Sequence, residues 1–504
     1  MQVCNQGMLP VSLRKLFPRA AMIGAEDYVL LDCTRDSRRV NRGDAFVAVS
    51  RRNADGHDFI VDAISRGAGV IVAERVPEDI PSVGPHGQFV PVCIVENSAQ
   101  AYAKICQALF RQPGDRLQLV GVTGTSGKTS SSCLIAGALG AAGHGVGLIG
   151  SLGYFDGMDA AHKVMGTPAP KRLSSWLARM CENDCSHAVI EVSSEALSQD
   201  FVGGLEFKTV CLTNVREDHL DYHGTVEAYR EAKMRIFERM APDGFAVLNA
   251  DDEISAEVAN WLDIPTLTFG IENPAEVSAT IIEQYVSEQI VLITAGGQTL
   301  PLRTRMIGRH HVYNCLAAAT VGLGMGVDLA TVLRGIESVD VVPGRLERLE
   351  CGQPFGVFVD QASTPDALYH TLDALMEVVE GRILCVFGAE GDGNTAKRAR
   401  MGEIIEKFAD VVILTDNNPR NEAPAKIVSE ILSGFCRPGD VQVCHARDKA
   451  IRDTLAQAKA GDCVLIAGKG NEKFQWVGEE MVKHEDRDVA RKWLYQNARK
   501  VKVR

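Results

Sequence analysis

The sequence predicts an α/β protein in which parallel sheets are distributed over three domains. Its 504 residues suffice for three or four domains of ordinary size. Breaker residues cluster at 112–115 and again at 341–344. Short apolar strands alternate with helical patterns, which is typical of parallel sheets with right-handed crossovers. We therefore expect domains at residues 1–114, 115–340 and 341–504.

Composition argues against several classes of protein. Apolar residues make up 46% and charged residues 23%, close to the globular average. The 53 Lys and Arg are scattered and outnumbered by 65 Asp and Glu, a net charge of −12 that argues against a nucleic-acid or anionic-membrane surface. No apolar run approaches the roughly 18–20 residues of a membrane span, and the first residues lack the apolar core of a signal peptide. The 14 cysteines form no CxxC or zinc pattern, so Cys181 and Cys185 are expected to be packed thiols of a cytoplasmic protein.

Apolar patterns predict the elements of the first two domains. The first domain ends with a helix over 99–110. The second opens with a buried-type strand at 117–122 and a helix at 130–142. Further elements follow along the chain: strands 188–191 and 210–214, and helices 225–240 and 329–336.

The third domain is predicted to be Rossmann-like. Four short apolar strands recur, each expected to lead through a polar turn into a helix: 356–360, 383–387, 411–415 and 463–467. Ligands of such sheets bind beyond the carboxyl ends of the strands, so we look for chemistry in the turns that follow them.

A glycine-rich turn joins the strand at 117–122 to the helix at 130–142. It reads Gly121-Val-Thr-Gly-Thr-Ser-Gly-Lys-Thr129, a variant of the phosphate loop because Val stands at 122 where the strict spacing has Gly. Small residues let backbone N–H groups reach phosphate oxygens at the N-terminus of a helix. The alternative is a glycine-rich turn with a surface lysine. We expect a P-loop-type site for a nucleoside triphosphate, formed by Gly124, Thr125, Ser126, Gly127, Lys128 and Thr129.

Three further residues follow the predicted strands and could serve a cation beside the loop. Glu191 ends one strand, His219 follows the next, and Lys233 lies on the helix after it. A triphosphate brings Mg²⁺, which prefers oxygen ligands and accepts imidazole. Taken alone, His219 could be a hydrogen-bonded turn residue and Lys233 a solvated helix residue.

Ordered motifs along nearly the whole chain resemble the Mur ligase family, the ATP-dependent amide-forming enzymes of peptidoglycan precursor synthesis. The resemblance is closest to the member that forms the tripeptide. The motifs that carry it are Asp36-Ser37-Arg38, Asp55-Gly56-His57, the TGTxGKT loop, Glu191-Val-Ser-Ser194, Thr213-Asn214, Asp218-His219, Pro343-Gly344-Arg345, Thr364-Pro365-Asp366, Asn418-Pro419-Arg420 and Gly468-Lys469-Gly470.

The resemblance implies a function and a set of roles. ATP and Mg²⁺ would activate the D-Glu carboxylate of UDP-N-acetylmuramoyl-L-Ala-D-Glu as an acyl phosphate, which meso-diaminopimelate or a related diamino acid then attacks. The enzyme would be a cytoplasmic monomer. Catalytic roles would fall to Lys128, Glu191, His219, Lys233 and Asp360. ATP would also contact Asn314 and Arg345. Metal ligands would be Thr129, Glu191, His219 and Lys233, the last as a carbamate. The UDP-sugar peptide would contact Ser37, Thr167 and Ser193. The amino acid would contact Asn418, Arg420, Gly468 and Glu472.

Several positions depart from the family pattern, mostly around the peptide and the amino acid. They are Glu195, Phe201, His311, Ser363, Gly393, Asn417 and Asn471. These departures leave three alternatives open: a ligase of the same fold for another acceptor, a folylpolyglutamate synthetase, and a nucleotide-binding paralogue without catalysis. The folylpolyglutamate alternative would lack the uridine-type domain that residues 30–75 resemble.

Overall fold

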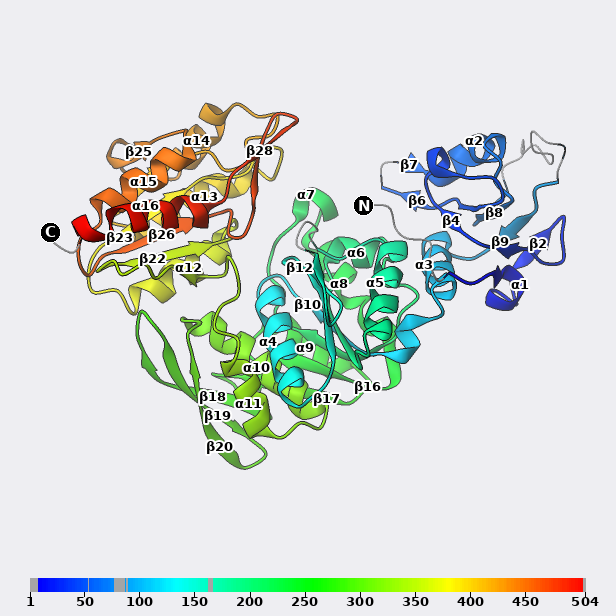
Figure 1. Ribbon diagram of the computed structural model, residues 1–504, viewed down its shortest axis with the longest axis horizontal. Helices are drawn as coiled ribbons and strands as arrows, with labels where there is room; N and C mark the ends of the chain where they lie inside the picture. Colours follow the sequence, from blue (N-terminus) through cyan, green and yellow to red (C-terminus); the bar gives the residue numbers. More distant parts are fainter. Residues whose placement is uncertain (1–7, 53, 77–86, 88, 162–165, 502–504) are drawn as a thin grey trace.

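The computed structural model describes residues 8–52, 54–76, 87, 89–161 and 166–501. Three bodies follow one another along the molecule, each built on its own sheet (Figure 1). Residues 1–7, on which part of the signal-peptide prediction depends, lie outside the described residues. The predicted α/β class is confirmed.

The N-terminal body has a five-stranded sheet in the order β2-β9-β8-β5-β4. Helix α3 packs on one face and α2 on the other, so apolar residues are buried on both sides. The bounds are β1 (Val11–Ser12), α1 (Leu13–Leu16), β2 (Ala21–Ile23), β3 (Val29–Leu30), β4 (Cys33–Thr34), β5 (Ala45–Val47), β6 (Ser50–Arg51), β7 (Ala54–Asp55), α2 (Ile60–Ser65), β8 (Val70–Ala73), β9 (Val92–Ile94) and α3 (Ser98–Leu109).

The central body has an eleven-stranded sheet in the order β13-β12-β11-β14-β10-β15-β16-β17-β18-β19-β20. Helices α4, α10 and α11 cover one face, while α5 and α8 cover the other. The strands are β10 (Gln118–Thr123), β11 (Val146–Gly150), β12 (Gly153–Phe155), β13 (Ala160–Ala161), β14 (His187–Glu191), β15 (Phe207–Leu212), β16 (Met240–Asn249), β17 (Thr266–Gly270), β18 (Val277–Gln284), β19 (Gln289–Ala295) and β20 (Gln298–Thr304). The helices are α4 (Lys128–Ala141), α5 (Pro170–Glu182), α6 (Ser194–Ser198), α7 (Leu220–His223), α8 (Val226–Met234), α9 (Glu253–Trp261), α10 (Arg309–Gly324) and α11 (Leu329–Glu337).

The C-terminal body has a six-stranded sheet in the order β21-β22-β26-β23-β24-β25. Helices α12 and α13 lie on one face and α15 and α16 on the other. The bounds are β21 (Glu347–Arg348), β22 (Gly356–Asp360), α12 (Pro365–Met376), β23 (Ile383–Phe387), α13 (Ala396–Phe408), β24 (Val411–Leu414), α14 (Pro424–Leu432), β25 (Gln442–Val443), α15 (Arg447–Gln457), β26 (Cys463–Ala467), β27 (Phe474–Val477), β28 (Glu480–Lys483) and α16 (Asp486–Val501).

Three sequence-based expectations about these elements are wrong. The helix expected to reach Met240 ends at Met234, because Met240 already pairs with Phe207 as the start of β16. Strand β26 leads into the β27–β28 hairpin rather than a helix, since Gly468 and Gly470 take positive φ angles of 104° and 54° and turn the chain. Strands β18 to β20 are antiparallel, a meander that the expected strand–helix alternation does not contain.

Two further expectations bear on the class of protein. Among the described residues, no helix has both the length and the apolar character to cross a membrane. The cysteines of the described part are free thiols. Cys185 is buried and its thiol donates to the carbonyl of Asp156 at 3.3 Å, so it packs as predicted.

Candidate active site

The glycine-rich turn lies between β10 and α4, at the carboxyl end of a strand in the interior of the sheet. Gly124 and Gly127 have φ angles of 147° and 85°. A Cβ atom on Gly124 would come within 3.0 Å of the Thr213 hydroxyl, and one on Gly127 within 3.0 Å of the Asn314 amide oxygen. Both positions therefore require glycine for conformational and steric reasons.

The end of the neighbouring strand, β15, holds the turn in place. The Ser126 N–H donates to Asn214 Oδ1 at 3.0 Å, and Asn214 Nδ2 donates to the Ser126 carbonyl at 3.1 Å. The Thr213 hydroxyl donates to the same carbonyl at 2.6 Å. Thr125 shares a 2.8 Å hydrogen bond with the hydroxyl of Tyr229 on α8. The loop is thus fixed before any ligand arrives.

Two lysines converge on the loop. Lys128 Nζ donates to the carbonyls of Gly124 and Thr125, both at 2.9 Å. Lys233 Nζ donates to the same Gly124 carbonyl at 2.7 Å and lies 4.7 Å from the ring centre of Tyr229. Burial lowers the pKa of both amines, and the neighbouring Lys128 charge lowers the pKa of Lys233 further. With a side chain 1% exposed, Lys233 is not a solvated helix residue.

Glu191 ends β14 beside the loop and is buried. The hydroxyls of Thr129 and Ser151 donate to Glu191 Oε2 at 3.1 and 3.0 Å, and the Ser151 N–H donates to Oε1 at 3.1 Å. No cationic side chain of the described ranges pairs with this carboxylate. The oxygens of Thr129 and Glu191 are ligands that suit Mg²⁺, so the residues present fit that ion.

His219 lies apart from this carboxylate. It takes a positive φ of 52° before α7, and its side chain is 45% exposed. Its Nδ1 is 3.2 Å from Glu195 Oε1, and its Nε2 is 3.5 Å from Asp218 Oδ2. Across the described part of the chain, no three His, Cys, Asp or Glu side chains are placed to hold a metal. The structure therefore joins Thr129 to Glu191 but leaves His219 with Glu195, a partner that the sequence did not reveal.

A cavity of about 500 Å³ opens over the loop. Its lining comes from the central and C-terminal bodies and includes Lys128, His311, Asn314, Arg345 and Asp360. Asn314 Nδ2 lies 3.3 Å from His311 Nδ1. Burial, helped by the charge of Arg345, lowers the pKa of His311 to about 3, so its imidazole is neutral at physiological pH. His311 thus offers hydrogen bonds without charge beside Asn314.

Arg345 links the C-terminal body to the loop. Its Nη2 donates to the Thr129 hydroxyl at 3.1 Å, and its Nη1 also bonds Gln361. Asp360 accepts from the Leu346 N–H at 2.5 Å and the Ala362 N–H at 2.7 Å, and burial raises its pKa. Asp360 also accepts from the Thr371 hydroxyl at 3.2 Å. Through the two N–H contacts, Asp360 shapes the turn that carries Arg345.

The residues expected to contact the UDP-linked peptide fall into two groups. The Thr167 hydroxyl donates to the Glu191 carbonyl at 2.7 Å and accepts from the Ser193 N–H at 3.0 Å. Ser37 lies in a short 3₁₀ helix of the N-terminal body and contacts neither of them. Phe201 is stacked by the Arg35 guanidinium, 5.0 Å from the ring centre.

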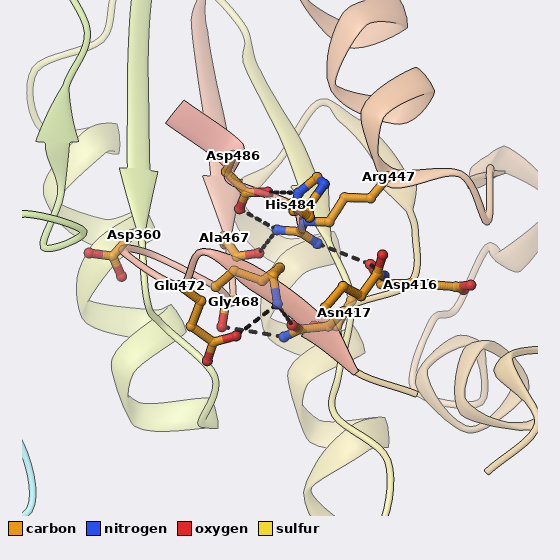
Figure 2. Close-up of polar contacts among 12 residues, drawn as sticks. Asp360, Asp416, Asn417, Arg447, Ala467, Gly468, Glu472, His484 and Asp486 are labelled. Atoms are coloured by element: carbon orange, nitrogen blue, oxygen red, sulfur yellow. Dashed lines mark hydrogen bonds and ion pairs between the residues drawn. The ribbon is translucent and has the colours of Figure 1, made fainter. Parts of the chain in front are cut away.

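The residues expected to bind the amino acid follow β24 and β26, and two of them, Gly468 and Glu472, are labelled in Figure 2. Asn418 Nδ2 donates to Glu472 Oε2 at 2.9 Å, and Asn417 Nδ2 donates to the Gly468 carbonyl at 3.3 Å. Arg420 is exposed, and its backbone N–H donates to the Trp476 carbonyl of the hairpin at 3.1 Å. The structure thus brings Asn418 and Glu472 into contact, with Gly468 beside Asn417.

Sequence reasoning gave no role to two charged groups of this body. Lys469 is wholly buried, and its ammonium donates to Glu472 at 2.7 Å and Asn418 at 2.8 Å; its place between Gly468 and Gly470 was a usable signal. Arg447 and Asp486 form a buried two-point ion pair with both N–O distances 2.7 Å, and His484 joins the same carboxylate (Figure 2). Nothing in the sequence could pair residues 39 positions apart.

Comparison with known proteins agrees with these motifs. Residues 122–322 match the Mur ligase middle domain, and residues 344–470 match the Mur ligase, glutamate ligase domain. A UDP-N-acetylmuramoyl-L-alanyl-D-glutamate–2,6-diaminopimelate ligase of Geobacillus thermodenitrificans is 37% identical over 93% of this chain and 95% of its own. One of Pseudomonas putida is 36% identical over 97% of this chain and 98% of its own.

Solved structures agree in fold. A ligase of the same name superposes with a TM-score of 0.68 at 25% identity, covering 97% of this chain and 100% of its own. The MurF ligase of Thermotoga maritima in complex with ADP has a TM-score of 0.58 at 21% identity, covering 93% and 97%. The chain is an ATP-utilising ligase by descent: it belongs to the Mur ligase family.

Proposed function

We propose that this chain ligates meso-diaminopimelate, or a related diamino acid, to UDP-N-acetylmuramoyl-L-Ala-D-Glu at the expense of ATP, in the cytoplasm and as a monomer. The observation that carries the proposal is the convergence of Lys128, Lys233 and Arg345 on one glycine loop beside the buried carboxylate of Glu191. The names of the full-length relatives at 36–37% identity support the choice of substrates.

The reaction begins with the meeting of two anions. The D-Glu carboxylate attacks the γ-phosphorus of ATP, ADP leaves, and an acyl phosphate forms. Lys128 and Arg345 are placed to offset the charge of the phosphates, and the loop N–H groups orient them. The free amine of the incoming amino acid then attacks the acyl carbon, and phosphate leaves with formation of the amide.

Metal ions are proposed to bind beside the loop, where the side-chain oxygens of Thr129 and Glu191 lie. Thr129 and Glu191 would hold one Mg²⁺, and Lys233 as a carbamate would help to hold a second, with His219 as a further ligand. Bound Mg²⁺ supplies positive charge to the phosphate oxygens. His219 must leave Glu195 to take part, and its exposed turn at positive φ leaves its side chain room to do so.

The uridine nucleotide and the incoming amino acid are assigned to the two outer bodies. Ser37 in the N-terminal body would contact the uridine nucleotide, and Thr167 and Ser193 the sugar-peptide beside Glu191. In the C-terminal body, Arg420 would grip a carboxylate of the amino acid, and Asn418, Glu472 and the backbone of Gly468 would also contact the amino acid. The Arg345 side chain reaches Thr129 from the C-terminal body. Further closure of that body over the loop would exclude water from the acyl phosphate.

Phosphate release tests the proposal. Enzyme, ATP and Mg²⁺ are mixed with UDP-muramoyl dipeptide and a panel of amino acids. Release that depends on diaminopimelate is the expected result. Release with a different amino acid would indicate a ligase for another acceptor. ATP binding without turnover with any amino acid would refute the proposed ligase activity.

A further inference from the structure

We infer that Glu390 binds the distal ammonium group of the incoming diamino acid, an inference that rests on the proposed function. Glu390 lies in the turn after β23, next to the turn after β24: the Gly391 N–H donates to the Asn418 carbonyl at 2.8 Å. Asn418 Nδ2 donates to Glu390 Oε1 at 3.0 Å and to Glu472 Oε2 at 2.9 Å. Because both acceptors bond one nitrogen, these two oxygens are at most 5.9 Å apart.

The negative charge of Glu472 is already compensated inside the protein. Lys469 is wholly buried, and its ammonium has three donors. They meet three acceptors: Glu472 Oε2 at 2.7 Å, Asn418 Oδ1 at 2.8 Å and Asn417 Oδ1 at 3.4 Å. An amide at 417 accepts a hydrogen bond without adding charge, so Lys469 and Glu472 form a neutral pair.

Glu390 differs from Glu472 in this respect. It is half-buried, and within the described ranges no Lys, Arg or His side chain lies in ion-pair contact with it. A carboxylate that accepts from an amide and has no cationic partner can bind the ammonium group of a ligand.

A complementary cation lies on the adjoining turn. Arg420 follows Asn418 by two residues, and its guanidinium is exposed and makes no ion pair with any described residue. The Glu390 carboxylate and the Arg420 guanidinium complement the ammonium and carboxylate groups, respectively, of a second amino-acid centre.

Substrate analogues separate this role from a structural one. Steady-state phosphate release is measured with diaminopimelate and with 2-aminopimelate, which keeps the distal carboxylate but lacks the distal amine. Wild type should favour diaminopimelate at least about tenfold in kcat/KM, the size expected of one charge-assisted hydrogen bond. Glu390→Gln, which keeps an oxygen for Asn418, should raise the KM for diaminopimelate about tenfold and erase most of that preference.

The other kinetic constants decide between a role in binding the amino acid and a general structural role. KM for ATP and for the UDP-linked dipeptide should stay unchanged, as should every constant of the control Glu380→Gln, an exposed position before β23 at the opposite edge of the sheet. An unchanged KM and preference in Glu390→Gln would overturn the inference while leaving the proposed function intact. If Glu390→Gln does not fold, equal kcat/KM values of wild type for diaminopimelate and 2-aminopimelate would also overturn the inference. A wild type inactive with every diamino acid refutes the proposed function, and this inference with it.

Discussion

Replacing Lys233 tests whether a second positive charge is tolerated beside the loop lysine or is converted to a negative one. Lys128 Nζ and Lys233 Nζ bond the same Gly124 carbonyl at 2.9 and 2.7 Å, so the two nitrogens are at most 5.6 Å apart. Lys233 is buried, and its lowered pKa favours the neutral amine. The neutral amine is the form that adds CO₂ to give a carbamate.

The geometry sets the size of the effect. Two unit charges 5.6 Å apart interact by about 3 kcal/mol at an effective dielectric constant of about 20. As ammonium, Lys233 would repel Lys128 by about that amount. The neutral amine removes this repulsion, and a carbamate at a similar distance would replace it with an attraction of the same order. Loss of one preorganised electrostatic contact to a transition state typically costs about 10²–10³-fold in kcat. Lys233→Ala should therefore lose at least that factor, and Lys233→Arg should not recover it, because a guanidinium forms no carbamate here.

The assay pairs turnover with a direct signature. Phosphate release is measured for wild type, Lys233→Ala and Lys233→Arg, and carbamate is detected by NMR after equilibration with ¹³C-bicarbonate. Wild type should give a carbamate signal that both variants lack. Lys208→Ala serves as the control, since Lys208 pairs with Asp243 at the protein surface and should keep full activity. Full activity of either Lys233 variant, or a carbamate signal that persists in Lys233→Ala, would refute the reasoning.

Three further substitutions test the loop and its supports. Arg345→Ala should lower kcat about 10²-fold by removing the cation that reaches Thr129, as measured by phosphate release at saturating ATP. Gly127→Ala should destabilise the fold by about 1–2 kcal/mol, because alanine is strained at φ 85°, and should weaken ATP binding in a calorimetric titration. Asp486→Asn should cost about 3–5 kcal/mol in urea unfolding at pH 7 by leaving Arg447 buried without its partner. The charge of Arg447 lowers the pKa of buried Asp486 despite the opposing effect of burial, so this stabilisation is present above the unfolded value of about 4 and is lost as the pH falls through the folded pKa. Wild type should lose more stability than Asp486→Asn between pH 5 and pH 2.

The sequence predicted the loop and its flanking elements well because their signals are local. The strand expected at 117–122 is β10, and the helix expected at 130–142 is α4. Strand alternation also placed Glu191 at the end of β14. Because β10 and β14 are parallel neighbours, the end of β14 lies beside β10, where Val122 pairs with Glu191.

What the sequence could not supply depends on contacts between distant segments. His219 and Glu195 are each readable as a motif residue, but their 3.2 Å contact arises from the way α6 and α7 meet. The antiparallel meander of β18 to β20 replaces the expected alternation because its strands bury one face only. Asp360 is expected from the resemblance to be catalytic, but the sequence could not show that its oxygens accept from the backbone N–H groups of residues 346 and 362.

The net charge of −12 conceals how the positive charges are arranged. Lys128, Lys233 and Arg345 come from three different elements, yet each donates to a loop residue between 124 and 129. Positive charge on any two of these groups is mutually repulsive, and burial, which lowers the pKa of both lysines, adds to the cost of charging them. A chain without an anionic ligand at this turn would gain stability by dispersing them. Their retention, beside a carboxylate that no cation of the described residues neutralises, is best explained by a polyanion and its metal ions completing the site.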